Sequence, residues 1–198
     1  MQAPASTMAE LLRVHLAREL KFFLEVMPCA RCGRGPLAVR AAKAAGKGPT
    51  DELPASVRTH CRSCNAQRTF HVEWIKRAAD QPSEIVDLAQ WVGLYFLYAD
   101  QVGKARTPGE SRAAARRAAQ CLAEALKFYG PDEMPPESAF RKEQSLAAFR
   151  NNPANFARTR LRDLQAMLPV AADAGQAEQS YDNPDAKPDA RKAWWKLW

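Results

Sequence analysis

Four of the five cysteines in this 198-residue chain fall into two identical C-x-x-C pairs. Cys29 pairs with Cys32 and Cys61 pairs with Cys64, and 28 residues lie between the pairs. Each pair places two thiolates on one tight turn, where both can bind the same ion. Two such turns supply the four soft sulfur ligands that tetrahedral Zn²⁺ prefers. The spacing therefore predicts a metal site that holds one structural Zn²⁺.

The residues around the two pairs are compatible with metal-binding turns. Gly33 follows the first pair and Asn65 follows the second. Glycine and asparagine tolerate a positive φ, which such a turn requires so that backbone N–H groups point at sulfur. Four arginines close to the pairs would offset the net negative charge of a zinc–tetrathiolate centre: Arg31, Arg34, Arg62 and Arg68.

With a strand predicted directly after the second pair, the double C-x-x-C resembles the zinc-ribbon and rubredoxin-like families over roughly residues 22–74. The resemblance implies a small antiparallel sheet carried on two metal-binding turns. Rubredoxins hold iron and transfer electrons, so an iron electron carrier is one alternative. Zinc is favoured because the surroundings are basic, whereas rubredoxin-like chains are usually acidic there, and because Asn65 replaces glycine after the second pair.

Two other uses of paired cysteines fit less well. Disulfides need an oxidising compartment, and residues 1–9 lack the basic and apolar stretches of a secretory signal peptide. A cytoplasmic location is therefore expected. A thioredoxin-like redox pair needs a strand before and a helix after the cysteines, which neither pair has. The fifth cysteine, Cys121, lies on a predicted apolar helix face and is expected to be buried.

Hydrophobic periodicity predicts helices on both sides of the cysteine region. Together with the four-cysteine zinc ribbon and small antiparallel sheet that the resemblance implies, it gives an α+β protein in which the ribbon is spliced between an N-terminal helix and a C-terminal helical bundle. The predicted segments are an N-terminal helix packing on the bundle (1–21), the zinc ribbon (22–80), the helical bundle (81–170), a flexible linker (171–190) and a Trp-rich C-terminal motif (191–198). Strands are expected at 56–60 and 67–74, one or two helical turns at 38–45, and helices at 87–102, 111–129, 145–149 and from 152 to 168.

The net charge of +7 is unevenly distributed. Residues 1–80 carry 13 basic and 7 acidic side chains, whereas residues 81–171 carry 12 and 10. The excess can attract an acidic protein face or the phosphates of a nucleic acid. Arg31, Arg34, Arg62 and Arg68 are the candidate contacts for either partner.

The sequence contains none of the common catalytic motifs, such as a Gly-rich phosphate loop, H-E-x-x-H or G-x-S-x-G. Four cysteines also leave zinc no open position for a catalytic water. We therefore expect a non-enzymatic, cytoplasmic interaction or regulatory protein in which structural zinc shapes a basic recognition surface. Nucleic-acid binding by the same region is the alternative.

The C-terminal motif holds three of the five tryptophans. Trp194, Trp195 and Trp198 follow a polar stretch and are interspersed with Lys192 and Lys196. We expect these residues to dock into an acidic groove of a partner protein. Folding back onto the chain's own body is the alternative, and binding at a membrane surface is less favoured because seven residues with two lysines bind lipid weakly.

Overall fold

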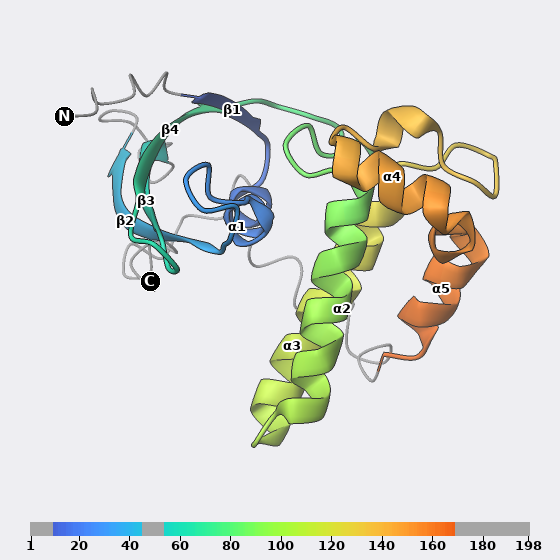
Figure 1. Ribbon diagram of the computed structural model, residues 1–198. Coiled ribbons are helices and arrows are strands. Elements are labelled where there is room, and N and C mark those ends of the chain that lie inside the picture. Colours follow the sequence, from blue (N-terminus) through green and yellow to red (C-terminus); the bar gives the residue numbers. More distant parts are fainter. Residues whose placement is uncertain (1–9, 45–53, 169–198) are drawn as a thin grey trace. The chain divides into compact units, whose positions relative to one another are not determined.

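The computed structural model describes residues 10–44 and 54–168, which fall into two compact units. Residues 10–44 and 54–77 form the first unit, and residues 78–168 form the second. Together they contain helices and a four-stranded sheet, in agreement with the predicted α+β class (Figure 1). Each unit is described separately below.

The first unit is a four-stranded sheet with strand order β1-β4-β3-β2 and one helix. Strands β2 (Leu37–Ala44), β3 (Pro54–Cys61) and β4 (Gln67–Trp74) are antiparallel neighbours. Strand β1 (Glu10–Val14) pairs with β4 in the parallel sense, so the sheet is mixed rather than purely antiparallel. Helix α1 (Ala17–Val26) follows β1 and lies inside the curve of the sheet (Figure 1).

Alternation along the strands places one face of this sheet against α1. Phe70 and Val72 of β4 are buried, and so is Val57 of β3. The residues that alternate with them, such as His71 and Arg58, are exposed on the other face. On the helix, Phe23 is buried and its ring meets that of Phe70 edge-on, with centroids 5.7 Å apart. Leu20 and Leu24 complete this apolar layer, which is the core of the first unit.

The predicted N-terminal helix is wrong for residues 10–14, which form β1. Leu12 and Val14 are buried while Leu11 and Arg13 are exposed, which is the alternation of a strand. Burial of these alternate residues and pairing with β4 outweigh the helical spacing of the leucines. The helix begins later, at Ala17, and its packing on the helical bundle stays a prediction.

The predicted helical turns at 38–45 are also wrong, because this segment forms β2. Alanine favours a helix by less than about 1 kcal/mol per residue over most residues. Pairing of β2 with β3 and burial of Leu37 outweigh that preference. The strands predicted at 56–60 and 67–74 are confirmed as β3 and β4.

The second unit is built on two long helices, α2 (Leu88–Lys104) and α3 (Pro108–Leu126), which lie side by side (Figure 1). Capping boxes fix both starts: Asp87 with Gln90 begins α2, and Thr107 with Glu110 begins α3. The remaining helical elements are η1 (Glu137–Ala139), α4 (Glu143–Asn151), η2 (Pro153–Phe156) and α5 (Arg158–Ala166).

The helix predictions hold for the second unit apart from their boundaries. Helix α3 begins at Pro108 because proline suits the first helical position. The helix predicted from 152 to 168 is interrupted at Ala157 into η2 and α5. Trp91 and Leu122 are buried between the helices, and Cys121 is buried as expected. Among the described helices, none has the length and apolar content needed to cross a membrane.

Candidate metal centre

The structure brings all four paired cysteines together. Their sulfur atoms lie within 4.8 Å of one another, close enough to hold one metal ion. The Sγ atoms of Cys29 and Cys64 are 3.6 Å apart, and those of Cys32 and Cys61 are 3.7 Å apart. Zn–S bonds of about 2.3 Å in a tetrahedron require sulfur atoms roughly 3.8 Å apart. The cluster therefore has the size of a tetrathiolate site for one ion.

The two cysteine turns share one hydrogen-bond pattern. In the first turn, the Cys29 N–H donates to the Arg34 carbonyl at 2.6 Å, and the Arg31 N–H donates to Cys29 Sγ at 3.4 Å. In the second turn, the Cys61 N–H donates to the Ala66 carbonyl at 2.9 Å, and the Ser63 N–H donates to Cys61 Sγ at 3.3 Å. Backbone N–H groups therefore point at sulfur in both turns, as the sequence predicts.

Gly33 and Asn65 occupy equivalent positions and both have a positive φ, at 67° and 58°. Their N–H groups donate to the carbonyls of Cys29 and Cys61, at 2.8 and 2.9 Å, and close the two turns. The expectation from these two residue types is confirmed. No other described residue that is not a glycine has a positive φ, so the strain of this conformation falls at Asn65 alone.

Replacing Asn65 by valine is expected to destabilise the first unit by about 1–2 kcal/mol, because a β-branched residue disfavours the left-handed region. The Asn65→Gly variant is the matched control, and it should remain close to the parent because glycine accepts the same φ. Hydrogen exchange of the β3 and β4 amides, measured in the zinc-loaded protein at increasing denaturant concentration, gives the stability of the first unit in each variant. Equal stability of the valine and glycine variants would contradict this account of the turn.

The backbone also tunes the acidity of the thiols. The N–H of Arg31, followed by that of Cys32, lowers the pKa of Cys29. Burial opposes ionisation of Cys61, but the N–H groups of Cys64 and Ser63 and the neighbouring thiols bring its pKa down to about 6. At Cys29 and Cys61 the backbone thus favours the thiolate, which is the form that binds metal.

Cys64 differs from Cys29 and Cys61 in the direction of its pKa shift. The Ala66 N–H favours the Cys64 thiolate, but burial and the three neighbouring cysteines oppose it more strongly and raise the pKa of Cys64 to about 12. Four thiolates this close repel one another, and a divalent cation at their centre offsets that repulsion. The donor set and the geometry fit Zn²⁺.

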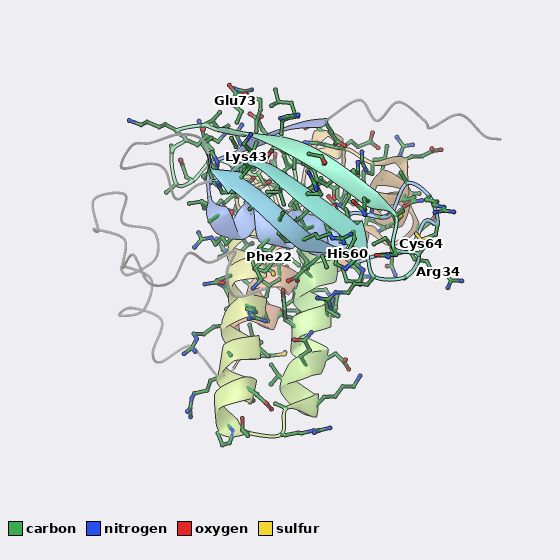
Figure 2. The ribbon with its side chains drawn as sticks, turned by 90° about the vertical axis from the view of Figure 1, so that its left-hand side faces the viewer. Phe22, Arg34, Lys43, His60, Cys64 and Glu73 are labelled. Atoms are coloured by element: carbon green, nitrogen blue, oxygen red, sulfur yellow. The ribbon has the colours of Figure 1, made fainter. Side chains whose placement is uncertain are left out.

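The four arginines named from sequence do not behave alike. Arg31, Arg34 and Arg62 are exposed on the two turns, and Figure 2 shows Arg34 beside Cys64 at one end of the sheet. Arg68 is half-buried, forms an ion pair with Glu10, and has its guanidinium carbon 4.9 Å from the centroid of the Phe70 ring. The guanidinium of Arg68 therefore interacts with other residues of the first unit.

Three exposed cations of the sheet were missed by sequence reasoning: Arg40, Lys43 and Arg58. The exposure of Arg58 could have been predicted, because it alternates with Val57 and Thr59, which are buried, in a predicted strand. Arg40 and Lys43 were hidden by the interpretation of 38–45 as helical turns. The C-terminal candidates Trp194, Trp195, Trp198, Lys192 and Lys196 lie outside the described residues.

No protein-family model, curated protein or solved structure matches this chain.

Proposed function

We propose that this chain is a non-enzymatic interaction protein whose first unit is stabilised by one structural Zn²⁺. Cys29, Cys32, Cys61 and Cys64 would hold the ion, and the surface that it stabilises would recognise an acidic partner. The observation that carries the proposal is the convergence of four sulfur atoms from two turns with matching hydrogen bonds.

A structural rather than catalytic metal is supported by the donor set. Four thiolates complete a tetrahedral shell, and Cys29 and Cys61 are only 6% and 1% exposed. Zinc is preferred over ferric iron, the oxidised state of an electron carrier, because a dication among four thiolates leaves a centre of charge −2, whereas ferric iron leaves −1. The exposed cations on the turns, Arg31, Arg34 and Arg62, better offset the more negative centre.

The metal would supply folding energy to a small unit. About 60 described residues form the sheet and α1, and units of this size bury too little surface to be robust alone. The ion would tie the end of α1, through the turn at Cys29, to the end of β3 at Cys61. Zinc binding and folding of this unit would then be coupled.

X-ray absorption of the zinc-loaded protein tests the closed coordination. The proposal predicts four sulfur neighbours at about 2.3 Å and no nitrogen or oxygen in the shell. Two or three sulfurs with one or more light atoms would indicate an open site and would overturn the structural role. In the protein as purified, before any zinc is added, an iron absorption edge in place of the zinc edge would favour the electron-carrier alternative.

The C-terminal motif is proposed as a second contact with the partner, on the sequence alone. Trp194, Trp195 and Trp198 would serve as apolar anchors, with Lys192 and Lys196 steering them toward an acidic groove. This part of the proposal is independent of the metal centre, because no residue of the motif belongs to the cysteine cluster.

A further inference from the structure

Positive charge is concentrated in the first unit. Its described residues include twelve Lys and Arg but only four Asp and Glu, a net charge of +8 without the thiolates. In residues 78–168 the numbers are twelve and eleven, a net charge of +1. The described part of the second unit is longer and yet nearly neutral, so the asymmetry is not a general property of the protein. The first unit therefore carries most of the field that would attract an anion.

Two cations of the strands, Lys43 and Arg58, share the face of the sheet that α1 does not cover. Arg58 of β3 stands opposite Ala41 of β2 and Thr69 of β4, and Lys43 stands opposite Ser56. Lys43 and Arg58 are thus diagonal neighbours on adjacent strands, roughly 7–8 Å apart at the backbone. Figure 2 shows this side of the sheet, with Lys43 and His60 labelled across it and Arg34 at the end that carries the cysteine turns.

We call this surface the outer face and define it by the outward residues of β2 and β3 and of the part of β4 that pairs with β3: Ala41, Lys43, Ser56, Arg58, His60, Gln67, Thr69 and His71. Glu73, the next outward residue of β4, forms an ion pair with Arg13 of β1. The alternate residues Val57, Phe70 and Val72 are buried on the opposite side. The outer face is continuous with the two cysteine turns because β2 begins just after the first turn and β3 ends in the second.

The cations of this region are available to a ligand. Six exposed cations of β2, β3 and the two cysteine turns have no ion-pair partner among the residues that the structure describes: Arg31, Arg34, Arg40, Lys43, Arg58 and Arg62. By contrast, Arg13 at the β1 edge pairs with Glu73 at 3.3 Å, and Arg68 pairs with Glu10. Carboxylates of the unit thus neutralise the sheet edge near β1 and leave the outer face and the turns positive.

The neighbours of these cations favour phosphate over a protein surface. Ser56, Thr69 and Gln67 add two hydroxyls and an amide, which are groups that commonly contact phosphate oxygens. Stable protein interfaces instead rely on a buried cluster of aromatic or aliphatic anchors. Leu11 is the one large hydrophobic side chain that is strongly exposed in the described part of this unit.

The lack of outward Phe, Tyr or Trp side chains on the described strands favours one form of the nucleic acid. None of the outward strand residues in the described part of the sheet is Phe, Tyr or Trp, and Trp74 donates its Nε1–H to the Pro54 carbonyl at 2.9 Å. Single-strand binding surfaces usually stack bases on the large rings of Phe, Tyr or Trp, and the only rings on this face are the smaller imidazoles of His60 and His71. A duplex presents its phosphates outward and needs no stacking partner.

We propose that the outer face and the two cysteine turns bind the phosphate backbone of double-stranded nucleic acid without reading its base sequence. The inference rests on the proposed function, since it names the acidic partner that the zinc-stabilised unit recognises. Arg58 and Lys43 make the central phosphate contacts, and Arg34 and Arg62 extend them along the turns.

Fluorescence anisotropy of the full, zinc-loaded chain with short labelled duplexes tests the proposal over a series of salt concentrations. Affinity should fall linearly with salt on logarithmic axes and should be unchanged when the base sequence is scrambled. The double variant Lys43→Gln with Arg58→Gln should bind at least tenfold more weakly and should lessen the slope by about two, one for each lost phosphate contact.

The matched control is Arg112→Gln with Arg116→Gln, which removes the same charge from exposed positions of α3 in the second unit. Its affinity and salt slope should stay close to those of the parent. An equal loss in both double variants would show that only net charge matters and would overturn the assignment of the outer face. Zinc content and circular dichroism confirm that each variant is folded.

Four ligands separate the possible partners: duplex DNA, duplex RNA, single strands and polyglutamate. Binding of either duplex in preference to the other two supports the proposal, and the preferred duplex identifies the source of the phosphates. Single strands that bind as tightly as duplexes would contradict the choice of duplex. Tighter binding of polyglutamate would assign the surface to an acidic protein. If none of the four ligands binds, this inference is overturned. The proposed four-sulfur zinc site would not be affected by that result, because X-ray absorption tests it separately.

Discussion

Replacing Cys64 by serine is expected to remove zinc from the purified protein and to unfold the first unit, while the helices of the second unit keep their circular dichroism. Structural zinc sites contribute an apparent binding free energy of about 10–16 kcal/mol, which exceeds the stability of most small units. Loss of one of the four ligands should therefore be enough to release zinc and unfold the first unit. Cys32→Ser should behave alike, because Cys32 lies 3.7 Å from Cys61 in the same cluster.

Cys121→Ala is the control for the general loss of a thiol. Cys121 is fully buried in the second unit and is not part of the four-sulfur cluster. This variant should keep its zinc and lose only a modest amount of helix stability. Retention of zinc by Cys64→Ser would contradict the account, and so would simultaneous loss of the second unit's helices.

The reciprocal experiment targets the core of the second unit. Trp91→Ala is expected to destabilise that unit by about 3–5 kcal/mol, because Trp91 is 1% exposed and its removal leaves a large cavity in the core. The melting temperature of the helical signal should fall steeply, while the zinc content stays at the parent level. Thermal circular dichroism and metal analysis of the same sample measure both quantities.

Phe96→Ala supplies the matched control on the same helix. Its side chain is 50% exposed, so its removal opens no cavity and should shift the melting temperature far less than Trp91→Ala. A similar shift in both variants would contradict the assignment of Trp91 to the core. Loss of zinc in Trp91→Ala would contradict the division of the chain into two units, each with its own core.

The cysteine site could be predicted from sequence because its determinants are local. Each C-x-x-C pair and its following residue specify one turn, and Gly33 and Asn65 adopt the positive φ that this turn needs. Strand β4 was equally evident, since Phe70, Val72 and Trp74 alternate with polar residues over an uninterrupted run. In these segments, local preference and tertiary structure agree.

The errors at β1 and β2 arise where tertiary contacts override local preference. Leu11, Leu12 and Leu16 have helical spacing, but only pairing with β4 explains why Leu12 is buried and Leu11 exposed. The alanines of β2 favour a helix until β3 supplies the partner strand. The outer face could not be predicted from the sequence because it depends on the register among β2, β3 and β4, which no local pattern reveals.

Metal analysis of the unmodified chain, purified without chelators, tests the central claim most directly. Inductively coupled plasma mass spectrometry, with the protein quantified by amino-acid analysis, gives the number of zinc and iron atoms per chain. The account predicts one zinc per chain, held by Cys29, Cys32, Cys61 and Cys64. Well under half an equivalent of zinc, or iron in its place, would contradict it.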